Sequence, residues 1–179
     1  MAVVPLQDVK DFLNITSTGS DNELVLTLDR AEAAIAARVG PLSPVTVTEV
    51  HHGGRNPIVL RRPPVIAVTS VVADAVTTVA GFDLDSEAGL LYSEFGYGYA
   101  GLPRSVRVTY QSGRAAPLPA DLEAAVLELT KHLWESQRGS APAALTGTGD
   151  DELRSAGSGF LLPYRVQSLL EPYLRPSVT

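Results

Sequence analysis

The sequence predicts an α+β fold, in which a small bundle of about four helices carries an inserted antiparallel β region. Helical periodicity occupies residues 1–43 and returns from residue 114 onward. Between these parts, apolar residues recur with a period near two, in short β-branched runs separated by turn residues. With 179 residues, 45% of them hydrophobic, the chain is long enough to bury a core.

The strongest helical pattern runs from Pro119 to Arg138. Its apolar residues follow one stripe of an amphipathic helix, at Leu122, Ala125, Val126, Leu129 and Leu133. Pro119 suits the first helical turn, and Gly139 follows as a stop. We therefore expect this helix to be the central member of the bundle.

Leu127 and Trp134 lie on a second apolar shoulder of the same helix, away from the main stripe. A helix with two apolar shoulders is expected to pack against two different partners. The second partner is either another element of this chain or a neighbouring copy. The intrachain alternative is favoured because large apolar residues are usually buried.

Two helices are predicted before the β region. The first begins at Leu6 after a proline and ends near Asn14. The second follows the capping-box pattern Ser20–Glu23 and is closed by Gly40 and a proline.

The β region is predicted to hold six short strands. Their expected ranges are Val45–Val50, Ile58–Leu60, Val65–Val72, Phe82–Asp85, Gly89–Tyr92 and Ser105–Gln111. Such strands form an antiparallel meander, a small barrel or a sandwich.

Residues 139–159 are rich in Gly, Ser, Thr and Ala, which predicts a flexible linker. Beyond it, a short helix is expected to start at Pro163 and to be closed by Pro172. The expected division is therefore N-terminal helices at 1–43, a β subdomain at 44–113, the central helix at 114–138, the linker at 139–159 and a C-terminal docking segment at 160–179. The docking surface is either the chain's own core or a partner.

Composition excludes several classes of function. The chain has no cysteine, which excludes disulfides and thiolate chemistry. Its 14 Lys and Arg against 20 Asp and Glu give a formal charge of −6, which disfavours a phosphate-gripping surface. No signal peptide and no stretch of about 20 apolar residues is present, so we expect a soluble protein made in a cytoplasm, with no membrane partner.

The search for chemistry predicts no catalytic residues, no cofactor and no metal. His51 and His52 are consecutive and point to opposite faces of a strand, so they are interpreted as polar residues at a strand end. The acidic residues from Asp83 to Glu87 lack the other features of a calcium loop. The glycine-rich segment Gly96–Gly101 matches neither a dinucleotide fingerprint nor a phosphate loop.

Four segments together resemble the head-tail connector, or adaptor, proteins of long-tailed bacteriophages and prophages. They are LQDVKDFLNI with the capped helix after it, IVLRRPPVIAVTSVV, VRVTYQSGRAAPLPADLEAAVLELTKHLWESQR and LLPYRVQSLLEPYLRP. In order, they span nearly the whole chain. The resemblance rests on this order and layout, since none of the four segments is a catalytic signature.

The resemblance implies a structural protein of the virion neck, present in the host cytoplasm during assembly. Adaptors form a ring, expected as a dodecamer, that joins the portal protein to the next neck or tail protein. DNA passes through the ring without specific binding. The residues expected at interfaces are Leu127, Trp134, Leu161, Leu162, Tyr164, Val166, Leu169, Leu170 and Tyr173.

Three alternatives stay open. Another neck protein, such as a stopper or a tail-completion protein, has the nearest layout. A non-viral β-barrel module would use Gly96–Gly101 to bind a ligand. A small hydrolase is disfavoured because no nucleophile and base pair can be placed on one face.

Overall fold

The computed structural model describes residues 3–54, 56–73, 77–78, 81–93, 105–138 and 162–174. The chain divides into two compact units. The helical unit comprises Met1–Val39 and Pro119–Thr179, and the β unit comprises Gly40–Leu118. The α+β prediction is confirmed.

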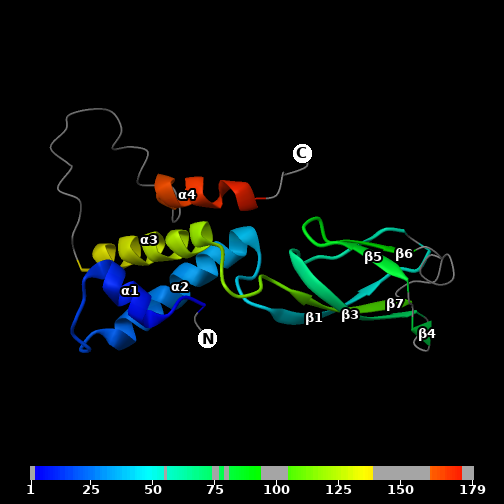
Figure 1. Ribbon diagram of the computed structural model, residues 1–179, viewed down its shortest axis with the longest axis horizontal. Coiled ribbons are helices and arrows are strands. Elements are labelled where there is room, and N and C mark those ends of the chain that lie inside the picture. Colours follow the sequence, from blue (N-terminus) through cyan, green and yellow to red (C-terminus); the bar gives the residue numbers. More distant parts are fainter. Residues whose placement is uncertain are drawn as a thin grey trace. The chain divides into compact units, whose positions relative to one another are not determined.

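The helical unit contains four helices, α1 (Leu6–Leu13), α2 (Asp21–Val39), α3 (Ala120–Gln137) and α4 (Tyr164–Leu170). A 3-10 turn, η1 (Glu171–Tyr173), extends α4. Helix α3 contacts each of the other three helices, and it lies between α4 and the pair of α1 and α2 (Figure 1). Helix α3, which covers most of the Pro119–Arg138 pattern, is therefore the innermost helix of this unit.

Prolines set the starts of three helices. Pro5, Pro119 and Pro163 each occupy the residue before a helix, in an extended conformation. The carbonyl of Pro119 accepts hydrogen bonds of 3.0 Å from the N–H groups of Leu122 and Glu123, which closes the first turn of α3.

The core of the helical unit is a set of fully buried aliphatic side chains from all four helices. Its largest members are Val9, Leu24, Leu28, Ile35, Leu122, Leu129, Val166 and Leu170. The i, i+4 and i, i+7 spacings within α2 and α3 place these residues on single faces, as the sequence predicted.

The β unit contains two antiparallel sheets. The first has the order β1 (Val45–His51), β7 (Val106–Ser112), β3 (Val65–Ala73), β4 (Thr77–Thr78), and the second has the order β2 (Ile58–Val59), β6 (Leu90–Ser93), β5 (Phe82–Asp85). The six predicted strands are all present, and β4 is an additional short strand.

The two sheets pack around one apolar cluster. It consists of Ile58, Leu60, Val65, Val71, Leu91, Val106, Val108 and Tyr110. Because the cluster draws on both sheets, and the described strands form no closed barrel, the arrangement is the sandwich among the three predicted alternatives.

Strand β7 is an inner strand of the first sheet, between β1 and β3. Val106, Val108, Tyr110 and Ser112 point inward, whereas Arg107 is exposed on the opposite face. After β7, Gly113 adopts φ +116, and a Cβ atom there would collide with the Ser43 carbonyl. Glycine is therefore required where the chain leaves the sheet.

Candidate functional site

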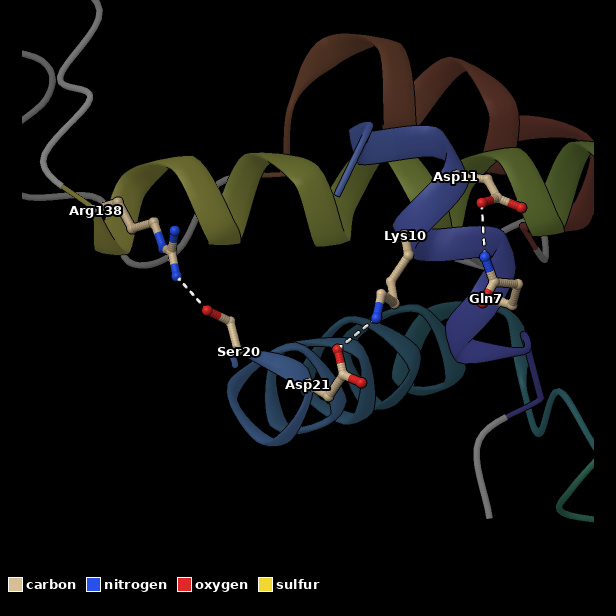
Figure 2. Close-up of polar contacts among 6 residues, drawn as sticks. All are labelled: Gln7, Lys10, Asp11, Ser20, Asp21 and Arg138. Carbon is tan, nitrogen blue, oxygen red and sulfur yellow. Dashed lines mark hydrogen bonds and ion pairs between the residues drawn. The ribbon is translucent and has the colours of Figure 1, made fainter. Parts of the chain in front are cut away.

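The ends of α1, α2 and α3 are joined by charged side chains. Lys10 of α1 is buried and its Nζ lies 2.8 Å from Asp21 Oδ1, at the start of α2. Arg138, directly after α3, donates from Nη2 to Ser20 Oγ (Figure 2). The distance between these two atoms is 3.0 Å. Figure 2 also shows Gln7 donating to Asp11 along α1, and the distance between Nε2 and Oδ1 is 2.7 Å.

Trp134 of α3 is buried in the helical unit. Its side chain is only 6% exposed, and the Arg138 guanidinium lies 4.0 Å from the centre of the indole ring. Leu127, the other residue of the second shoulder, is half-buried. Trp134 is therefore packed within its own chain.

The C-terminal segment is folded on α3 of its own chain. Leu162, Val166 and Leu170 are 4%, 0% and 1% exposed. Outside this apolar contact, Arg165 Nε lies 3.2 Å from Glu128 Oε1 of α3. The described part of the segment therefore has its apolar face covered without any partner.

The remaining members of the segment differ in exposure. Leu169 and Tyr173 are half-buried, whereas Tyr164 is 86% exposed and Leu174 is 43% exposed. Leu161 lies outside the described residues. Of the predicted interface residues that the structure describes, Tyr164 offers the largest free side chain to a partner.

The β unit contains a polar cluster that the sequence analysis missed. Tyr110 donates from its hydroxyl to Glu49 Oε1 at 2.7 Å, and both side chains are buried. The N–H of Arg61 donates to Glu49 Oε2 at 3.2 Å, and the N–H of Arg62 donates to the Tyr110 hydroxyl at 3.2 Å. The cluster therefore fixes the segment between β2 and β3 to the inner face of β1 and β7.

His51 completes this cluster. Its Nε2 lies 3.1 Å from Glu49 Oε2, which makes an ion pair only when the imidazole is protonated, and Nε2 is buried without a hydrogen bond. Burial lowers the pKa of His51 below its ordinary 6.5 and outweighs the opposing effect of Glu49. Burial, together with the hydrogen bond to Glu49, raises the pKa of Tyr110.

A hollow of about 700 Å³ opens beside the cluster. Its lining residues are Thr48–His52, at the end of β1, together with Pro57–Val59 and Arg61. A smaller hollow of about 140 Å³ lies between α3 and α4, where Glu128 and Arg165 meet. The lining of the larger hollow mixes one carboxylate, two imidazoles, one guanidinium and aliphatic side chains.

In the described parts of the chain, no group of three or more His, Cys, Asp or Glu side chains is arranged to hold a metal ion. No helix in those parts is long and apolar enough to cross a membrane. The segments Gly96–Gly101 and 139–159 lie outside the described residues.

The family of the chain follows from a match over almost its whole length. The family model of the head completion proteins matches residues 2–175. The chain belongs to the head completion protein family. It is therefore a structural protein of phage-like particles rather than an enzyme, as the resemblance to adaptor proteins implied.

Solved structures support the fold of this head completion protein. Similar chains occur in structures described as the virion of a native gene transfer agent particle, the neck of an empty particle computed with C6 symmetry, and the neck of a native particle computed with C12 symmetry. Sequence identities are 22%, 22% and 21%, with TM-scores of 0.65, 0.66 and 0.62. The alignments cover 99%, 99% and 98% of this chain and 92%, 92% and 93% of the others. A comparison with curated protein sequences found no match.

Proposed function

We propose that this head completion protein is the neck adaptor of a phage-like particle. Copies of the chain close into a ring beneath the portal protein, and the ring joins the head to the next neck or tail protein. The observation that carries the proposal is the family match, combined with a fold shared over nearly the full chain with components of particle necks computed with C6 and C12 symmetry. On this basis we propose a ring of twelve copies.

The charge of the chain suits a ring that extends a DNA channel. A protein that neutralised phosphates would bind the passing DNA strongly and without regard to sequence. The formal charge of −6 works against such retention. We propose that DNA passes through without specific binding.

The exposed side chains of the helical unit are the proposed contacts with the neighbouring neck components. Tyr164 stands out because aromatic residues are enriched in protein interfaces. On α2, Val25 and Leu26 are 37% and 57% exposed. These side chains are available while Leu162, Val166 and Leu170 hold α4 on α3.

Complementation of particle assembly tests the proposed function. Particles produced without this chain are expected to package DNA into portal-bearing heads that carry no tail. Addition of the purified protein, followed by tails, is expected to restore complete particles. If heads without the chain still showed ring density directly below the portal and lacked only a lower component, the chain would be a stopper or a tail-completion protein. If they joined tails normally, the neck role would be excluded.

A further inference from the structure

The net negative charge of the chain lies entirely in its helical unit. The β unit, Gly40–Leu118, contains six arginines and six acidic residues and is formally neutral. The helical unit therefore holds the remaining eight basic and 14 acidic residues, which gives the whole −6. Identical copies can meet through their β units without net charge repulsion.

Within the β unit, the larger hollow lies where both sheets have an edge. Strand β1 is an outer strand of the first sheet and β2 is an outer strand of the second. Both strands line the hollow. Outer strands present backbone N–H and C=O groups outward and accept another strand readily. We call the space bordered by β1, β2 and Arg61 the edge groove.

The surface of the edge groove is partly apolar and partly basic. Val59 of β2 is 61% exposed, and the side chain of Arg61 is exposed at the rim. The Glu49 carboxylate below is buried and engaged by Tyr110 and by the N–H of Arg61. Among the side chains that line the groove, Arg61 is the exposed one that carries a full charge, whereas the charge of Glu49 is buried.

The opposite edge of the second sheet has the complementary character. Strand β5 is its other outer strand, and Asp83 and Asp85 are exposed on it. The side chains of Phe82 and Leu84 alternate with them and pack on the apolar cluster. Asp83 Oδ1 accepts from the Leu84 N–H at 3.0 Å and Asp85 Oδ1 accepts from the Ala88 N–H at 3.0 Å, so both carboxylates are held at this edge.

We propose that the edge groove receives the β5 edge of the neighbouring copy, with Asp83 and Asp85 facing Arg61. This inference rests on the proposed ring and names its lateral contact. Because the two surfaces differ, the contact is head-to-tail, and head-to-tail contacts close into rings when the rotation permits. The partner is thus a second copy of this chain rather than the portal or the next neck protein.

Charge reversal on each side of the contact tests the proposal in the particle itself. Heads made without the chain are incubated with purified R61E or with D83K/D85K, and neck-ring occupancy is measured by electron microscopy. Because each reversal places like charges opposite one another, each variant is expected to need roughly a hundredfold higher concentration than the unaltered protein. R107E, which reverses an exposed arginine on the inner strand β7, serves as the matched control and is expected to assemble normally.

Mixing the two variants distinguishes a direct contact from damage to the fold. In a mixture, the acidic groove of R61E meets the basic edge of D83K/D85K, and the unaltered groove of the second meets the unaltered edge of the first. Rings of alternating subunits are therefore expected, although neither variant assembles alone. If R61E unfolds on thermal melting, R61Q replaces it and is expected to weaken assembly about tenfold.

Two results would overturn the contact. If R61E and D83K/D85K each assembled normally alone, the contact would be rejected and the proposed ring would stand. Failure of the mixture to restore rings would have the same meaning. Absence of a ring with the unaltered protein would instead reject the proposed function, together with this contact.

Discussion

Tyr110 and Glu49 form a buried hydrogen bond of 2.7 Å between the hydroxyl and Oε1, which joins β7 to β1 inside the β unit. Each partner also accepts an N–H from the arginine pair that follows β2. The pair therefore holds the backbone at the rim of the edge groove.

Tyr110→Phe is expected to destabilise the β unit by about 1–3 kcal/mol, because it leaves a buried carboxylate without one donor. Urea denaturation followed by far-UV circular dichroism measures the loss. Gln111→Ala, which truncates an exposed side chain on the solvent side of the same strand, is the control and is expected to change stability by about 0.5 kcal/mol or less. Equal stability of Y110F and the unaltered protein would contradict the structural role of the bond.

Acidification is expected to weaken the β unit through His51. The folded state lowers the pKa of His51 from its ordinary value of 6.5. As the pH falls through 6.5, the unfolded chain therefore takes up a proton at His51 before the folded chain does. The free energy of unfolding should therefore fall as the pH drops through about 6.5 and stop falling, for this group, below the pKa in the folded state. In H51Q, the free energy of unfolding is expected to depend less on pH over the same range. If the pH dependence of H51Q equalled that of the unaltered protein, His51 would not be the group responsible.

The single tryptophan makes the helical unit separately observable. In Arg138→Ala, the loss of the cation over the Trp134 ring is expected to shift indole emission to longer wavelength and to cost about 0.5–1 kcal/mol. Arg30→Ala, an exposed arginine on α2, should leave the emission unchanged. An unshifted spectrum in R138A would mean that the guanidinium does not cover the ring in solution.

The docking of α4 on α3 predicts a sharp contrast between two residues of α4 that lie two positions apart. Val166→Asp places a charge at a fully buried position and is expected to destabilise the helical unit by roughly 3 kcal/mol. Tyr164→Ala changes a side chain that is 86% exposed and should alter stability by about 0.5 kcal/mol or less. Truncation after Gly159 is likewise expected to destabilise this unit, and an unaffected unfolding curve would show that α4 contributes nothing to the isolated fold.

Much of the secondary structure follows from local patterns in the sequence. The 3.6-residue period and Pro119 place α3 almost to the residue, and β-branched runs place six strands. The pairing of β1 and β3 on either side of β7 could not be predicted, because it depends on contacts between residues far apart in the chain. The same long-range packing decides that Trp134 is buried.

The polar cluster shows where a sequence signal existed but was ambiguous. Glu49 falls in phase with Val45 and Val47, which places it on the inward face of β1, although glutamate is rarely buried without a partner. Its partner, Tyr110, is 61 residues away. Only the folded sandwich brings the two together and shows that the chain fixes Arg61 at a groove.

The symmetry and position of the chain in assembled necks test the central claim most directly. Cryo-electron microscopy of complete particles, reconstructed at the neck without imposed symmetry, is expected to show one ring directly below the portal into which twelve copies of this fold can be placed. A neck whose ring below the portal cannot hold this fold, or particles from which the chain is absent, would contradict it.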